Sequence, residues 1–292
     1  MPLSRGSGGY GPPATYTPPP ETGLIFPANN ATNSDIRLLF SGAVIPPRTG
    51  CTIMWSSRSN SSITGYVTHC FFAYNDGTWH AGNYEWGGHP YPANSASADG
   101  TGQSTDPGGG TGTTHYMEMA GLGARDQIAV PGTAVLATKD GATWKRHALQ
   151  ASLVNSDTQV RHRYWPDVIG DSTNYFERIV NVGDIPSPGA PAFYWGTSDW
   201  RSGSAGANTN DETPNGALRG FCISSSGALT NAQIAAVAAL NTDSAVVSYM
   251  SGQGLGLWYC NMNPTPTDVT DKSGNGRDPS WANALRPTLY TG

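Results

Sequence analysis

The sequence predicts an all-β sandwich domain, and three features of the chain support this fold class. Of its 292 residues, 37 are Gly and 22 are Pro, while only 13% are charged. This composition is typical of many short strands joined by turns, with little helix. Apolar runs of about four to eight residues recur between Gly- and Pro-rich turns. The length is compatible with one large sandwich domain or two small ones, and we place a single domain at residues 23–292.

The segment Met1–Thr22 is rich in Gly, Pro and Tyr and has no hydrophobic period. Such a segment cannot contribute to a core and is typical of extended, polyproline-like chain. It is either a disordered tail or an arm that lies in a groove of a partner subunit. A Pro-rich arm loses little entropy on ordering. For such an arm we expect these docking residues: Tyr10, Pro12, Pro13, Tyr16, Pro18, Pro19 and Pro20.

Strands are expected from Leu24 onward, wherever a short apolar run lies between turn residues. The expected strands cover residues 36–40, 51–55, 67–74, 127–137, 148–154, 160–165, 175–182, 193–196 and 217–223. The run Asn75–Gly77 between two aromatic residues is a hairpin signal, and Asp140–Gly141 is a second one. Residues 82–114 contain almost no aliphatic side chains and are expected to form a long loop.

One short helix is expected at Thr230–Leu240. Thr230 is a residue type that caps helices, and Gln233 stands at the capping-box spacing. Leu229 and Ile234 are placed to form a hydrophobic staple across the cap. An apolar stripe with helical period follows: Ile234, Val237, Ala238 and Leu240.

This strand, its Ser/Gly turn and the helix beginning at Leu229-Thr230 resemble the closing segment of concanavalin A-like (laminin G-like) jelly-roll domains. The run Asp271–Gly276 looks like the Asp-x-Ser-Gly-Asn-Gly turn of that family. The resemblance implies a two-sheet jelly-roll sandwich with the helix packed beside it. The family usually carries this turn ahead of the helix, whereas here it follows the helix. Either the terminal strands are arranged differently, or this end of the chain is a docking element.

The four cysteines show no Cys-x-x-Cys spacing and are too few for a disulfide framework. All of them stand among apolar or aromatic neighbours, so buried thiols are favoured over disulfides. They are Cys51, Cys70, Cys222 and Cys260.

The charge pattern argues against nucleic acid as a partner. The net charge is −5, with 16 basic and 21 acidic residues, and no basic run is present. No apolar stretch approaches the roughly 20 residues of a membrane span. The N-terminus lacks the pattern of a secretory signal. We therefore expect either a mature chain or release by another route, such as within a virus particle.

The acidic residues do not fit a glycan hydrolase. Hydrolases of the concanavalin A-like fold carry carboxylates on one strand, at spacings such as Glu-x-Asp-x-x-Glu. None of the five Glu here has a second carboxylate two positions away. They are Glu21, Glu85, Glu118, Glu177 and Glu212. A polysaccharide lyase would have Arg161–Tyr164 available, although this run is more typical of an alternating strand with exposed Arg and His.

A cluster of oxygen-bearing side chains near the C-terminus suits calcium, because Ca²⁺ prefers carboxylate and carbonyl oxygens. Its members are Asp268, Asp271, Asn275 and Asp278. The alternative is a purely structural turn, in which Asp271 caps backbone N–H groups. No other cofactor is expected.

Two groups of aromatic and polar residues are typical of sugar binding, because sugars stack on rings and bond to polar side chains. The alternative for the Trp residues is core packing. The candidate glycan-binding residues are Trp79, Tyr84, Trp86, Tyr91, Trp195, Asp199, Trp200 and Arg201.

Together, the arm, the lectin-like sandwich and the low charge look like a bacteriophage virion protein: a capsid-decorating, fibre or tail-associated component. We expect a non-enzymatic homo-oligomer on the virion exterior. Its arm would dock on other virion subunits, and its outward domain would contact a surface glycan. The first alternative is a free, extracellular glycan-binding lectin. The second is a polysaccharide-degrading lyase or hydrolase.

Overall fold

The computed structural model describes residues 22–26, 36–41, 46–47, 50–59, 70–73, 85–91, 114–121, 124–130, 144–165, 167–170, 172–173, 175–182, 192–196, 216–227, 229–281, 284 and 286–291. Residues 1–21 of the predicted arm (1–22) and the two predicted hairpin turns lie outside these residues.

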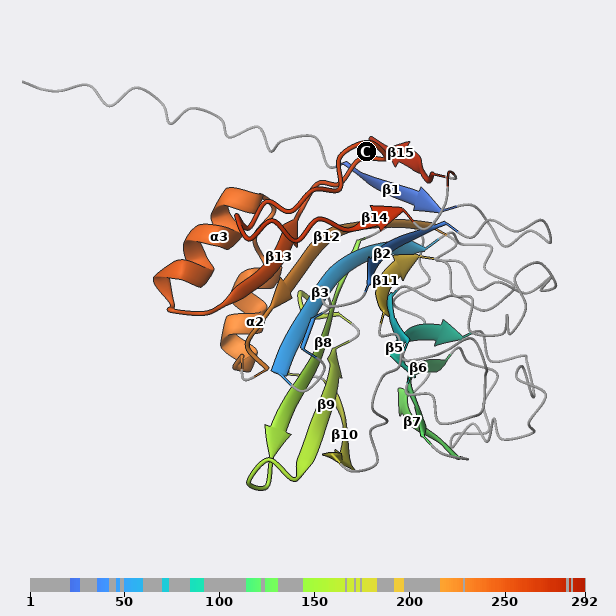
Figure 1. The fold of residues 1–292 in the computed structure, drawn as a ribbon, viewed down its shortest axis with the longest axis vertical. Coiled ribbons are helices and arrows are strands. Elements are labelled where there is room, and N and C mark those ends of the chain that lie inside the picture. The colour runs from blue at the N-terminus through green and yellow to red at the C-terminus, as the bar shows by residue number, and fades with distance from the viewer. Residues whose placement is uncertain are drawn as a thin grey trace, which may run out of the picture.

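Two antiparallel sheets face each other and form the predicted sandwich (Figure 1). Sheet A has the order β10-β9-β8-β3-β12-β1-β15, with β13 also paired to β12. Its strands are β1 (Gly23–Phe26), β3 (Gly50–Ser59), β8 (Lys145–Val154), β9 (Gln159–Trp165), β10 (Phe176–Asn181), β12 (Gly216–Ser224), β13 (Leu257–Asn261) and β15 (Thr288–Tyr290).

Sheet B has the order β14-β2-β11-β4-β5-β6-β7. Its strands are β2 (Arg37–Ser41), β4 (Cys70–Ala73), β5 (Glu85–Tyr91), β6 (Thr114–Gly121), β7 (Ala124–Val130), β11 (Ala192–Gly196) and β14 (Ser280–Trp281). The prediction of an all-β sandwich is therefore confirmed.

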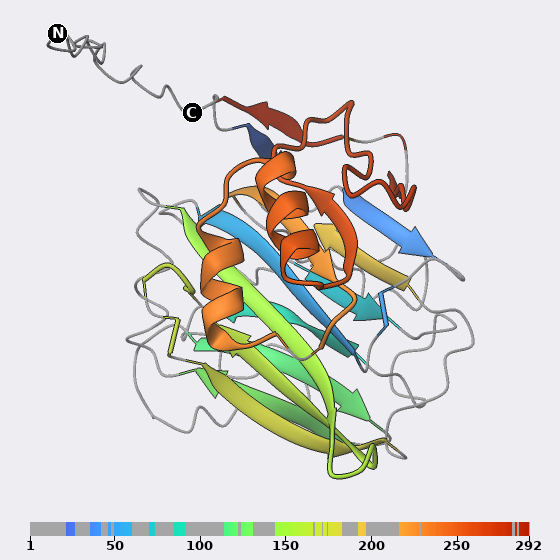
Figure 2. The same cartoon turned by 90° about the vertical axis from the view of Figure 1, so that its left-hand side faces the viewer.

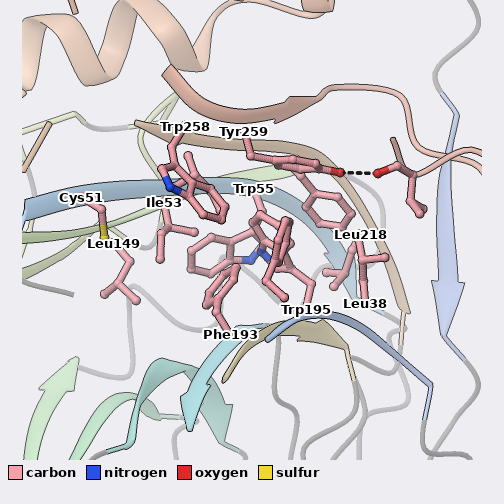
Figure 3. Close-up of a cluster of buried hydrophobic side chains, with 14 of the residues drawn as sticks. Leu38, Cys51, Ile53, Trp55, Leu149, Phe193, Trp195, Leu218, Trp258 and Tyr259 are labelled. Atoms are coloured by element: carbon pink, nitrogen blue, oxygen red, sulfur yellow. Dashed lines mark hydrogen bonds between the residues drawn. The ribbon is translucent and has the colours of Figure 1, made fainter. Parts of the chain in front are cut away.

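The main core lies between the two sheets and is rich in aromatic rings (Figure 3). Trp195 stacks on Phe221 at 4.4 Å between ring centroids, which joins β11 of sheet B to β12 of sheet A. Tyr259 is also buried, and its hydroxyl donates a hydrogen bond to the Val269 carbonyl at 2.8 Å. A buried Tyr hydroxyl needs such a partner, because a polar group without one is costly in a core.

A β-bulge at Gly220 decides which side chains of β12 enter this core. The register between β12 and β3 shifts between Arg219 and Cys222, and Gly220 has a φ of +66°. The extra residue resets the two-residue alternation, so Leu218 and Phe221 both face the core although they are three positions apart. Cys222 then faces the opposite side of the sheet.

Two helices cover that opposite, outer face of sheet A (Figure 2). The predicted helix is α2 (Asn231–Ala238), and its Thr230–Gln233 capping box is present. Ile234 and Val237 are fully buried against the sheet, as the apolar stripe predicts. Leu229 also belongs to this cluster.

The prediction of a single helix is wrong, because a second one, α3 (Asp243–Gly252), follows directly. Its signals are present in the sequence: the Thr242 hydroxyl accepts a hydrogen bond from Ala245 N, and Asp243 stands in the first turn. Its buried residues, Val246 and Met250, are four positions apart, which is one helical face.

Part of the expected 82–114 loop is also a strand. β5 pairs with β4 on one side and β6 on the other, although its sequence contains two Gly and one Pro. These residue types disfavour strands, so the tertiary pairing overrides local preference. Strand β6 was likewise not expected from the sequence.

The C-terminal segment is built into the sandwich. After the Asp271–Gly276 turn, β14 pairs with β2 in sheet B, and β15 pairs with β1 in sheet A. The segment after the turn therefore contributes one strand to each sheet. No helix among the described residues is long and apolar enough to cross a membrane.

The cysteines whose side chains are described are free and buried, as predicted: Cys51, Cys222 and Cys260. Cys222 and Cys260 are direct partners in the β12–β13 pairing. We expect these three thiols to resist a thiol-specific reagent such as DTNB in the native protein and to react in guanidinium. Rapid native labelling of any of them, located by peptide mass mapping, would contradict the buried placement.

His162 leads to a prediction about pH. It is fully buried rather than exposed, and burial lowers its pKa from 6.5 to about 3. Between these two values the unfolded chain binds a proton that the folded chain does not. Stability should therefore fall as pH drops below about 6.5, by up to about 1.4 kcal/mol per pH unit from this group.

Urea unfolding of the wild type and His162→Gln at pH 7 and pH 5 tests this assignment. The variant should lose less stability between the two pH values than the wild type does. Equal losses in both proteins would show that His162 is not the titrating group.

Candidate functional site

The predicted glycan-binding role of Trp195 is wrong. Its side chain is fully buried and packs against Phe221, Phe193 and Phe40 between the sheets. The Trp195 segment was predicted both as a strand and as a binding site, and core packing explains its apolar character.

The other predicted glycan residues remain predictions. Trp86 and Tyr91 belong to β5, and only their backbone is described. β5 and β11, the strands that contain Trp86, Tyr91 and Trp195, lie in the same sheet with β4 between them. The remaining candidates lie outside the described residues: Trp79, Tyr84, Asp199, Trp200 and Arg201.

The Asp271 turn has the hydrogen bonds of a structural element. Asp271 Oδ1 accepts from the backbone N–H groups of Cys260 and Ser273, at 3.1 and 2.8 Å. Its Oδ2 accepts from Arg277 N at 3.1 Å. Asp278 in turn accepts from Asp271 N at 2.7 Å. These donors attach the turn to the edge of β13 and occupy the oxygens that a cation would need.

The two other members of the proposed calcium site also have partners. Asp268 is ion-paired with Lys272 at 2.8 Å, and the hydrogen bond from Lys272 lowers the pKa of Asp268. Asn275 uses its amide N–H to bond the Leu257 carbonyl at 2.7 Å. Within the described ranges, no group of three or more His, Cys, Asp or Glu side chains is arranged to hold a metal ion. Calcium binding here stays a prediction.

The run considered for a lyase divides between two faces of β9. Arg161 and Arg163 lie on one face, where each is ion-paired with Glu177, at 3.5 and 2.6 Å. His162 and Tyr164 are fully buried. Because adjacent strand residues point to opposite faces, these four side chains cannot converge on one substrate.

The core also contains a Ser–His–Tyr chain. Ser57 Oγ lies 2.7 Å from His147 Nε2, and His147 Nδ1 lies 3.0 Å from the Tyr164 hydroxyl. His147 stacks on Trp55 at 5.1 Å. A Ser next to a His is the geometry of an activated nucleophile. All three side chains are no more than 2% exposed, so the chain satisfies buried polar groups of the core.

The candidate site is a pocket on the outer face of sheet A, beside the helices. We call it the Arg146 pocket. It encloses about 40 Å³ and is lined mainly by residues of β3, β8 and β12 and of the loops that follow α2 and β13. A space of this size accommodates a few water molecules or one small polar group. Its polar lining residues are Ser56, Trp144, Arg146, Arg219, Asn241 and Asn263.

Arg146 is only 1% exposed, and it reaches this place because of the bulge in β12. Its Nη1 donates to the Gly220 carbonyl and to Ser56 Oγ, the latter at 3.2 Å. A Cβ at Gly220 would lie 2.1 Å from Nη1, so only Gly leaves room for the guanidinium. Burial lowers the pKa of Arg146 to about 10, so it is still charged at neutral pH.

Trp144, which lines the Arg146 pocket, is in contact with a cation and with a second aromatic ring. The Arg219 guanidinium lies 4.3 Å from the centroid of the Trp144 ring, which is a cation–π contact. Tyr290 meets Trp144 edge-to-face at 5.2 Å, and Arg58 bonds the Tyr290 hydroxyl. These contacts hold Trp144 in a fixed orientation beside the pocket.

The sequence analysis missed this site because its residues come from distant segments. Ser56, Arg146, Arg219 and Asn263 are brought together only by the β8–β3–β12 pairing and by the loops after α2 and β13. One feature of the sequence could have indicated the site. Arg146 is a charged residue two positions before Ala148, on the same face of a strand that is otherwise largely apolar.

The comparisons with known proteins give structural matches alone. No family model matches the chain, and no curated protein matches its sequence. A pentraxin from Limulus polyphemus is 13% identical, with a TM-score of 0.41, over 75% of this chain and 82% of its own. A candidate carbohydrate-binding protein from Bacteroides ovatus is 14% identical, with a TM-score of 0.47, over 93% of this chain and 60% of its own.

A third match is the enzymatically active domain of tailspike protein 2 from bacteriophage CBA120. It is 11% identical, with a TM-score of 0.42, and the match covers 76% of this chain and 31% of the tailspike domain. This chain therefore spans less than two thirds of the length of two of these three structures. Concanavalin A-like or laminin G-type jelly-roll folds, the group that the helix and the Asp271 turn resemble, are found in all three.

Proposed function

We propose that this chain is a non-enzymatic carbohydrate-binding protein that acts on the exterior of a virion, with the Arg146 pocket as a glycan site. The observation that supports the glycan role most directly is the set of open donors in this pocket. Trp144 Nε1 and Arg146 Nε are both buried N–H groups without a hydrogen-bond partner. Buried donors normally have partners, so two of them at one pocket favour a ligand rich in oxygen acceptors.

The pocket rim has the amide groups that sugar hydroxyls require. Asn263 uses its Nδ2 to bond the Asn241 carbonyl at 3.0 Å, which fixes the amide and leaves its side-chain oxygen for a ligand. Asn241 itself is exposed at the pocket. An aromatic ring beside a few convergent polar groups is the usual composition of a small-ligand site.

The non-enzymatic part of the proposal rests on the titratable groups in the described part of the chain. His162 lies in the core with a pKa of about 3, and the acidic residues Asp271 and Glu177 already have partners. Acid–base catalysis needs a group near pKa 7 at a cleft. The Arg146 pocket is lined by no carboxylate and no His.

The virion part rests on the sequence features of the arm and the low charge. Many copies on one particle would make weak sugar binding effective through avidity. A free lectin, which is the alternative, would have such avidity only as an oligomer.

We expect Trp144→Ala to weaken glycan binding at least about tenfold, because it removes both the indole donor and a pocket wall. Glycan-array screening followed by calorimetry on the best ligand would measure this. Trp144→Phe keeps an aromatic ring next to Arg219 and removes the N–H together with the five-membered ring of the indole, so the loss of affinity should be smaller than in Trp144→Ala. Trp281→Ala is a matched control, because Trp281 lies outside the pocket. Its ring centroid is 5.4 Å from the Arg286 guanidinium carbon, so it also has a cation–π partner. Unchanged binding by Trp144→Ala would rule out this pocket.

A second experiment tests the arm. A chain that begins at Gly23 keeps β1 and its pairing with β12 and β15, so the sandwich should be unchanged. We expect the full chain to form a defined oligomer or to join a particle, and the shortened chain to stay monomeric, as measured by light scattering. If both chains are identical monomers with no particle association, the virion role is wrong and the free-lectin alternative is favoured.

A further inference from the structure

The geometry of the Arg146 pocket points to an acidic sugar: we propose that Arg146 binds the carboxylate of a uronic-acid-type glycan. This inference rests on the proposed carbohydrate function and names the chemical class of its ligand.

The N–H donors of Arg146 differ in whether they have a hydrogen-bond acceptor. A guanidinium has five N–H groups. The two on Nη1 are satisfied by the Gly220 carbonyl and Ser56 Oγ. Nε has no partner, and the contact of Nη2 is with the Met262 thioether at 3.9 Å, a weak acceptor. Nε and Nη2 form the side of the guanidinium that binds a carboxylate through two parallel hydrogen bonds. That side is unoccupied by any strong acceptor.

The positive charge of Arg146 is not neutralised by a carboxylate of the described chain. Its hydrogen bonds reach a hydroxyl, a carbonyl and a thioether. The nearby Asp167 is ion-paired with Lys145 at 3.2 Å, and Asp243 accepts from Met262 N at 2.7 Å. Arg219 adds a second cation at the same pocket. A buried charge without a counter-ion is costly, and an anionic ligand removes that cost.

A structural role explains only half of this arrangement. Holding the β12 bulge requires a donor to the Gly220 carbonyl, and Nη1 supplies it. That role does not require Nε or Nη2 to lack a strong acceptor, nor does it require an open space beside them. Recognition of an anionic ligand accounts for both features.

The pocket can admit a carboxylate after a small movement. Its volume of about 40 Å³ suits a group of that size, whereas a whole sugar ring would remain at the rim beside Trp144 and the asparagines. Met262 lines the pocket and touches Nη2. Met side chains have flexible torsions, so the thioether is the group that an entering carboxylate would displace.

The test compares four probes on the full chain by calorimetry or ligand-observed NMR: D-glucuronate, its methyl ester, D-glucose and glucose 6-sulfate. We expect glucuronate to bind at least about tenfold more tightly than glucose or the ester, because only the free acid pairs with the guanidinium. Glucose 6-sulfate should bind more weakly than glucuronate, because its tetrahedral anion is larger than the planar carboxylate.

Variants then assign the effect to Arg146. Arg146→Lys keeps the charge and loses the two parallel donors, so the preference for glucuronate over glucose should disappear. The buried site can fail to fold in this variant, so circular dichroism accompanies it, and the ester comparison provides the same test without a mutation. Arg163→Lys makes the same substitution outside the pocket, at a residue ion-paired with Glu177, and serves as a control that should retain the preference.

The outcomes separate this inference from the proposed function. Equal binding of glucose, ester and glucuronate, lost in Trp144→Ala, would overturn the acidic-sugar inference and leave carbohydrate binding intact. Equal binding of glucose 6-sulfate and glucuronate would overturn the carboxylate assignment. No binding of any probe or of any arrayed glycan would overturn both.

Discussion

The bulge at Gly220 is the constraint on which the rest of sheet A depends. Strand β12 has three neighbours in the sheet, because it pairs with β1, β3 and β13. A strand without the extra residue would carry either Leu218 or Phe221 on the wrong face, since side chains alternate strictly. With the bulge, both enter the aromatic core, and Cys222 faces the helices.

Burial of both faces of sheet A follows from this arrangement. In β3, Ile53 and Trp55 pack between the sheets, whereas Met54 packs beneath the helices. Two-sided burial explains why the strands read as continuous apolar runs rather than as clean alternation. It also leaves little place for a charge, so a buried arginine in β8 needs a specific reason.

That reason is local to the same bulge. The missing side chain at Gly220 creates room for the Arg146 guanidinium, and the displaced carbonyl gives it one strong acceptor. Arg146 also lines the pocket where β12 and the loops after α2 and β13 meet, and its Nε has no hydrogen-bond partner. Bulges often occur beside functional sites because they redirect side chains in this manner. The packing of the core and the candidate site are therefore consequences of one backbone irregularity.

The sequence by itself determined the elements whose signals are local. The α2 helix could be predicted because Thr230 and Gln233 form a capping box within a single turn. The central strands could be predicted because their apolar runs are contiguous.

Other features depended on partners far away in the chain. β5 forms despite its Gly and Pro residues because two neighbours pair with it. Trp195 looked like a ligand-binding ring until Phe221, 26 positions later, proved to be its partner in the core. The Arg146 pocket joins residues from position 56 to position 263, and no local pattern encodes that proximity. Hydrogen bonds across a sheet are set by register and topology, so this site was decided only by the tertiary structure.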